Sequence, residues 1–165
     1  MDIKIRLQFV CIFLMLFPFV VAGQISHGGI PIQVQKLKSY SNNTDLVIMP
    51  FVDNISMRNL YSQTSENRLK PFRFAHSFGV SLNLKNSGTW YNTSDINVWQ
   101  LRIRSVGAYS LNLILNRFNL PDGARLFLIS QKTGEIKGAY TSGNNSENHV
   151  LAIEPVEGDE ILVQY

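Results

Sequence analysis

Cysteine is almost absent from this sequence, and its absence excludes several functions. Cys11 is the one cysteine in 165 residues, and it lies inside an apolar N-terminal run. A chain without paired thiols has no disulfide, no thiolate metal site and no cysteine nucleophile outside that run. Its folded part must therefore depend on a hydrophobic core, and the length suits one such core better than two.

Charged residues are also scarce. Asp, Glu, Lys and Arg together form 16% of the chain, against about 25% in average soluble proteins. The formal net charge is only +3, and the lysines and arginines are scattered along the sequence. A nucleic-acid-binding surface needs clustered basic residues. We therefore expect no nucleic-acid partner.

The motifs of common catalytic and cofactor sites are missing as well. The sequence contains no G-x-S-x-G elbow, no H-E-x-x-H pair, no G-x-G-x-x-G and no Walker A loop. The histidines His27, His76 and His149 stand far apart, and His76 is expected in the core or a cleft. We predict no catalytic residue, no cofactor and no metal. The turn acids Asp122, Asp159 and Glu160 are interpreted as turn formers and not as calcium ligands.

An apolar run at the N-terminus has the pattern of a secretory signal. Lys4 and Arg6 precede the run from Leu7 to Val21, and the small residues of Val21-Ala22-Gly23 follow. This pattern predicts cleavage before Gln24. A membrane anchor is the alternative, but the run is shorter than the ~20 residues that span a bilayer. We expect an exported protein, periplasmic, cell-surface or extracellular, without a membrane segment after cleavage.

Alternating hydrophobicity beyond Pro71 predicts β-structure. Every second residue from Phe72 to Leu84 is apolar or His76, which indicates a long strand with one buried face. Other predicted strands, separated by turn residues, are 98–105, 109–115, 125–130, 150–153 and 161–165, with edge strands at 32–37 and 46–52. The residues 24–31 are expected to be a flexible start, with Gly28-Gly29 and Pro31 as breakers.

Together these elements predict an all-β fold, an antiparallel β-sandwich of the jelly-roll type. At most one short helix is expected, near residues 54–66, with Asn54 as its cap. The expected organisation is a signal peptide at 1–23, an extended N-terminal segment with edge strands at 24–69 and a sandwich core at 70–165.

Two aromatic residues are the candidate ligand platform. Trp90 and Tyr91 follow the turn at Gly88, and sugar-binding sandwiches stack ligands on exposed aromatic rings. Trp90 either forms such a platform or caps the end of the sandwich. Trp99 alternates with polar neighbours on its strand and is expected in the core.

Several short motifs occur in an order typical of one family of secreted enzymes. They are Gly23 to Pro31 (GQISHGGIP), Met49 to Asp53 (MPFVD), Lys70 to Phe74 (KPFRF), Leu82 to Trp90 (LNLKNSGTW), Val98 to Ile103 (VWQLRI), Gly107 to Leu113 (GAYSLNL) and Leu120 to Phe127 (LPDGARLF). In these motifs the chain resembles the N-terminal, non-catalytic region of secreted bacterial trypsin-like serine peptidases of the lysyl endopeptidase type. The resemblance extends from Gly23 to Tyr165.

The resemblance implies a pro-region or accessory domain, not an enzyme. Its expected partner is a peptidase domain, in cis or in trans, whose folding, restraint or targeting it assists. The family's catalytic domain follows this region, whereas this sequence stops at Tyr165. We therefore expect a fragment of a longer protein. The alternative function is a carbohydrate- or cell-surface-binding sandwich that uses Trp90 and Tyr91 against a surface glycan.

Overall fold

The computed structural model describes residues 26–32, 44–63, 75–92 and 94–165, and its regular elements are mainly strands. The described strands are β1 (Leu46–Ile48), β2 (Thr89–Asn92), β3 (Asn97–Arg104), β4 (Ser110–Leu111), β5 (Ile114–Asn116), β6 (Leu126–Ser130), β7 (Ile136–Tyr140), β8 (Val150–Ala152), β9 (Val156–Glu157) and β10 (Glu160–Gln164). The helices are α2 (Asn54–Gln63) and the short 3-10 helix η3 (Ser142–Asn144). The all-β class and the short helix near residues 54–66 are confirmed.

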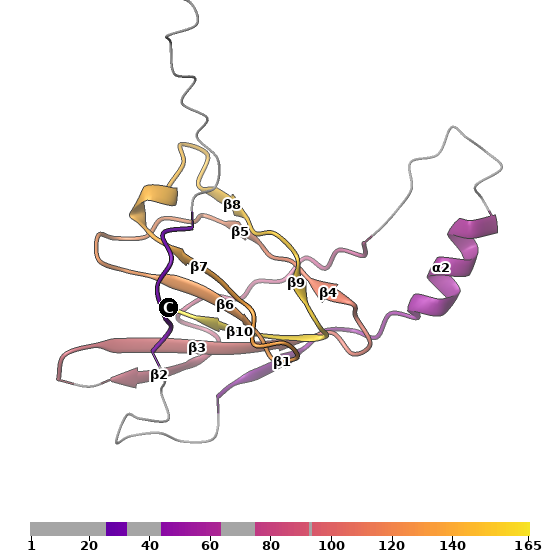
Figure 1. Cartoon of the computed structure of the whole chain (residues 1–165), viewed down its shortest axis with the longest axis horizontal. Helices are drawn as coiled ribbons and strands as arrows, with labels where there is room; N and C mark the ends of the chain where they lie inside the picture. Colours follow the sequence, from indigo (N-terminus) through magenta and orange to yellow (C-terminus); the bar gives the residue numbers. More distant parts are fainter. Residues whose placement is uncertain (1–25, 33–43, 64–74, 93) are drawn as a thin grey trace, which may run out of the picture.

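The largest sheet has six strands, in the order β1-β3-β10-β6-β7, with β2 also paired to β3 (Figure 1). Its pairings are antiparallel except for β1 on β3, which is parallel. β1 and β2 follow one another along the same edge of β3, and β10 occupies the opposite edge. The predicted antiparallel pairing holds for this sheet except at β1, and the jelly-roll sandwich topology stays a prediction.

A two-stranded ribbon forms the second layer. β4 pairs with β9, and β5 pairs with β8. The amide of Ile153 donates to the Leu113 carbonyl over 2.9 Å, which joins the two pairs into one antiparallel ribbon. The register shifts by one residue between Leu111↔Val156 and Ile114↔Ala152, and this shift breaks the alternating run 109–115 into two short strands.

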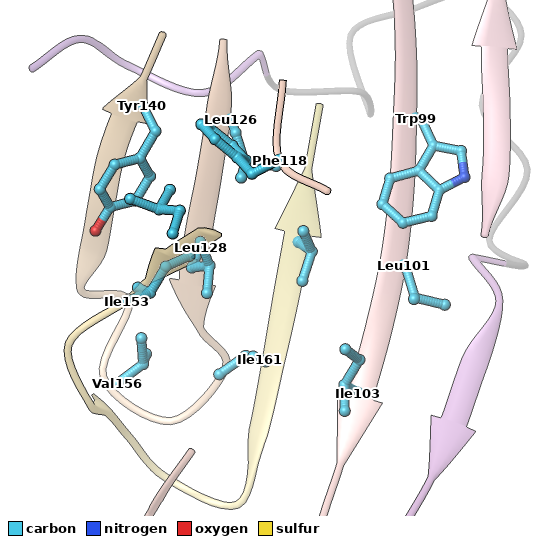
Figure 2. Close-up of a cluster of buried hydrophobic side chains, with 12 residues drawn as sticks. Trp99, Leu101, Ile103, Phe118, Leu126, Leu128, Tyr140, Ile153, Val156 and Ile161 are labelled. Carbon is cyan, nitrogen blue, oxygen red and sulfur yellow. The ribbon is translucent and has the colours of Figure 1, made fainter. Parts of the chain in front are cut away.

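The core lies between the sheet and the ribbon (Figure 2). Alternate residues of the sheet point into it because successive side chains of a strand lie on opposite faces. The sheet contributes Trp99, Leu101, Ile103, Leu126, Leu128, Tyr140, Ile161 and Val163, and the ribbon side contributes Phe118, Leu151, Ile153 and Val156. The predicted inward positions of Trp99, Leu101 and Ile103 are thus confirmed.

The strongest predicted strand, Phe72 to Leu84, is wrong over its described part. Residues 75–83 form no strand, and the residues before them lie outside the described part of the chain. Val80 is 55% exposed, and the His76 ring packs on Phe78 at a centroid distance of 4.7 Å. Leu82 alone among these alternate residues is packed against the main core. An alternating pattern indicates which side chains of a strand would be buried, but a strand also needs a neighbouring strand to pair with. Both edges of β3, β10 and β6 are already paired.

The start of α2 also differs from expectation. Asp53 caps the helix, because its Oδ1 accepts from the amides of Ile55 (3.1 Å) and Ser56 (2.9 Å). The predicted cap, Asn54, instead donates its Nδ2 to the Gly107 carbonyl over 2.6 Å. That bond ties the beginning of α2 to the turn between β3 and β4, while the rest of the helix extends away from the sheets (Figure 1).

The outer face of the large sheet is covered in part by residues 26–32. His27 donates its amide to the Ala139 carbonyl of β7 over 3.0 Å, and the Ala139 amide donates to Gly28 over 3.2 Å. The described residues 26–31 of the expected flexible start form no helix or strand but are bonded to β7. The predicted edge strand at 32–37 lies, apart from Ile32, outside the described residues. The edge strand predicted at 46–52 is confirmed as the shorter β1.

Within the described residues, no helix is both long and apolar enough to cross a membrane.

Candidate functional site

The two residues of the predicted platform, Trp90 and Tyr91, lie on opposite faces of β2. Trp90 is 41% exposed, whereas Tyr91 is 4% exposed and its hydroxyl lies 2.9 Å from the Thr44 hydroxyl. Tyr91 opposes Val98 across the strand pair and forms a small buried cluster with it. The structure therefore does not combine Trp90 and Tyr91 into one stacking surface.

Trp90 makes its contacts at the end of the large sheet. Its indole Nε1 donates to the Leu84 carbonyl over 3.1 Å, and its ring meets Tyr165 edge-on at 6.2 Å between centroids and 85° between planes. These contacts agree with the predicted cap. The exposed part of the ring also leaves room for a stacked ligand, so both interpretations of Trp90 stay open to experiment.

The three histidines occupy separate places. His27 lies beside η3, where its Nε2 would be 3.2 Å from a Cβ placed on Gly143. His149 has a positive φ of 52° and donates its amide to the Ser146 carbonyl in a turn. His76 was expected in the core or a cleft; it is exposed and therefore not in the core, and it lines a hollow. Among the described residues, no group of three His, Cys, Asp or Glu side chains could hold a metal ion.

The hollow beside His76 lies at the beginning of α2. Its lining is mostly apolar and consists of Phe51, Val52, Asp53, Ser56, Met57 and His76. A serine, an aspartate and a histidine therefore meet at one place, which invites comparison with a catalytic triad. The pairing is different, because the Ser56 hydroxyl donates directly to Asp53 Oδ2 over 2.6 Å. In a triad the histidine lies between the other two residues.

Asp53 and Ser56 are better explained by the helix cap. The hydrogen bonds from the Ser56 hydroxyl and amide, with a smaller contribution from Ile55, hold the pKa of the Asp53 carboxyl below its ordinary value. A carboxylate with these bonds prefers its charged form and stabilises the first turn of α2. We therefore assign this pair a structural role.

Several other charged groups form ion pairs. The Arg102 guanidinium lies 2.6 Å from Glu160, and Arg104 lies 3.6 Å from Asp159. These bonds use two of the predicted turn acids, Asp159 and Glu160, which agrees with the structural interpretation of those acids. The hydrogen bond from Glu135 is the main reason that the pKa of Lys137 is raised, with Glu154 adding to it.

Exposed apolar residues flank both partners of the bond between Asn54 and Gly107 in the sequence. Phe51 is 77% exposed, Ile55 73% and Tyr109 75%, and Val106 is also exposed. We call these four residues the apolar surface. Soluble proteins rarely leave large apolar residues clustered in water unless the surface binds something. The predicted strand at 109–115 gave no sign that Tyr109 would be exposed.

No protein-family model matches the chain, and no solved structure matches it either.

Proposed function

We propose that this chain is an exported, non-catalytic module that binds a trypsin-like serine peptidase domain, in cis or in trans, and assists its folding, restraint or targeting. Two observations support the proposal. The sequence motifs resemble the N-terminal region of lysyl endopeptidase-type enzymes, as described above. The apolar surface gives the module a place where a protein partner would bury hydrophobic area.

The single observation that carries the proposal is the exposure of Phe51 and Tyr109. Complete burial of such aromatic side chains is worth about 2–3 kcal/mol each. The hydrogen bond from Asn54 Nδ2 to the Gly107 carbonyl, 2.6 Å long, joins the two chain segments that carry these residues. Exposed aromatic residues are typical of those that dominate protein–protein binding energy.

A binding and refolding experiment tests the proposal. The chain is mixed with a lysyl endopeptidase-type catalytic domain, and binding is measured by calorimetry while recovered activity is measured after refolding. We expect binding and a change in the recovered or inhibited activity. Phe51→Ser and Tyr109→Ser should each weaken binding about tenfold, because each removes more than 1 kcal/mol of buried contact.

Ile114→Ser is the matched control. Ile114 is 63% exposed but lies on the ribbon, away from the apolar surface. Its substitution should leave binding unchanged. A chain that neither binds the catalytic domain nor alters its activity contradicts the proposed function, and equal effects of all three substitutions contradict the proposed surface.

Export is part of the same proposal. The signal pattern at residues 1–23 predicts that the mature chain begins at Gln24. N-terminal sequencing of protein recovered from outside the cytoplasm checks this expectation, and a chain that still begins at Met1 contradicts it.

The exposed indole of Trp90 supports a second candidate function, the binding of a surface glycan. Stacking on this ring would be lost in Trp90→Ala. Binding on a glycan array that disappears in this variant, while the melting temperature remains close to that of the parent chain, would favour the glycan function over peptidase binding.

A further inference from the structure

Residues 26–32, which we call the clasp, lie across the outer face of the large sheet. At one end, the Ser26 hydroxyl donates to the Gly138 carbonyl. The amide of His27 donates to the Ala139 carbonyl over 3.0 Å, and the Ala139 amide donates to Gly28 over 3.2 Å. The clasp therefore bonds to the free edge of β7, in the way that an added extended peptide bonds to a sheet edge.

The other end of the clasp is held by a buried carboxamide. Gln164 of β10 is 3% exposed. With its nitrogen facing the Ile32 carbonyl, this nitrogen lies 3.0 Å from that oxygen, and the carboxamide oxygen lies 2.8 Å from the Ile32 amide. Gln164 thus presents one donor and one acceptor to a peptide unit, as a neighbouring strand would.

The backbone conformation in the middle of the clasp favours a glycine. Gly29 has a φ of +115°, which strains any other residue, and it lies beside the Phe127 ring, where an added Cβ would make an ordinary contact at 3.7 Å. Phe127 is 3% exposed and lies on the outer face of β6. The side chain of Ile30, by contrast, is 80% exposed. The sheet therefore recognises the clasp by its backbone and by its glycine.

We infer that the β7 edge, Phe127 and Gln164 form a binding groove for a peptide that passes Phe127 with a positive-φ glycine, and that the clasp is its intramolecular occupant. This groove lies on the outer face of the sheet, and its existence does not depend on the proposed peptidase partner. Tethering gives the clasp an effective concentration on the order of millimolar, so it blocks the groove until it is released.

Release of the clasp in the full chain tests this inference. Valine strongly disfavours the φ of Gly29, so Gly29→Val should detach the clasp. Detachment is verified by faster hydrogen exchange at the His27 amide. A fluorescent peptide with the sequence of residues 24–32 is then titrated against each chain, and its anisotropy is measured. We expect saturable binding to the Gly29→Val chain and at least tenfold weaker binding to the parent chain.

The matched control is the same peptide with valine in place of its second glycine, which should not bind. A folded Gly29→Val chain with a detached clasp that binds neither peptide overturns the inference, and so does equal binding of the two peptides. If Gly29→Val fails to fold, hydrogen exchange on the parent chain decides. The His27 and Ala139 amides should exchange through local opening, while the Val163 amide should require global unfolding. Exchange of all three amides only by global unfolding overturns the inference.

Discussion

At the scale of the single residue, the lack of a side chain at Gly88 allows the Trp99 ring of the core to pack against the backbone. It precedes β2 with a φ of +78°, and a Cβ placed on it would lie 2.3–2.5 Å from three atoms of the Trp99 ring. The indole Nε1 of Trp99 donates to the neighbouring Ser87 carbonyl over 2.8 Å. The indole therefore fits only against a glycine, and this contact fixes the turn that leads into β2.

Gly88→Ala should lower the free energy of unfolding by about 3 kcal/mol, because overpacking adds to the cost of a positive φ. Urea denaturation followed by tryptophan fluorescence measures this change. Gly123→Ala is the control, since Gly123 has a φ of +81° with no atom within 4 Å of an added Cβ. Its cost should be about 1 kcal/mol, from conformation alone. Equal costs at the two positions would show that the overlap with Trp99 is relieved without penalty.

At the scale of the element, the cap of α2 makes the helix sensitive to acid. The pKa of Asp53 lies below its ordinary value because the charged carboxylate accepts hydrogen bonds, first from Ser56. The unfolded chain therefore binds a proton at Asp53 more readily than the folded chain does. The contribution of the cap is fully present above the ordinary value of 3.8 and is lost as the pH falls through the lower, folded pKa.

Exchange of the Met57 amide, which donates to the Asp53 carbonyl over 3.0 Å, reports on this first turn. In the parent chain its protection should decrease below about pH 4. Asp53→Asn keeps a good capping residue without a titrating group, so its protection should be independent of pH in this range. A similar loss of protection in both chains would show that Asp53 is not the titrating group.

The elements that the sequence predicted well are those with a regular apolar side facing the core. Trp99, Leu101 and Ile103 alternate on β3, and the strand and its inward face are both confirmed. The run around Leu128 likewise became β6. β7 was missed because Lys137 and Gly138 interrupt its apolar pattern, and because the register shift beside Phe127 depends on its partner strand.

The candidate sites were harder to predict, because they depend on strand geometry and on contacts between residues that are far apart in the sequence. Trp90 and Tyr91 are neighbours in sequence, but strand geometry places them on opposite faces. The apolar surface depends on the bond from Asn54 to Gly107, and the clasp depends on Gln164 and Ala139. Such long-range contacts leave no local pattern that a single sequence reveals.

At the scale of the whole molecule, the order of strands makes the C-terminal strand central. β10 lies between β3 and β6, where Ile161 opposes Ile103 on one side and Ser130 on the other. Ile161 is fully buried and Val163 is 5% exposed. β3 and β6 therefore become part of one sheet only when β10, the last described strand, has formed between them. Most pairings of the sheet join residues that are far apart in the sequence. Domains with such non-local contacts fold slowly.

Deletion of residues 160–165 should abolish the cooperative unfolding transition. The two buried side chains alone contribute about 3–6 kcal/mol, and the lost hydrogen bonds with β3 and β6 add to that, against a total stability of about 5–15 kcal/mol for a domain. Replacement of residues 55–63 by a glycine-serine sequence of equal length is the control. None of the core residues that the structure describes comes from α2, so its melting temperature should fall by no more than a few degrees, about 4 °C. Circular dichroism during heating measures both variants. A cooperative transition in the chain without β10 would contradict the central role of β10 in the sheet. Loss of the transition in the chain with α2 replaced would show that the fold depends on the helix.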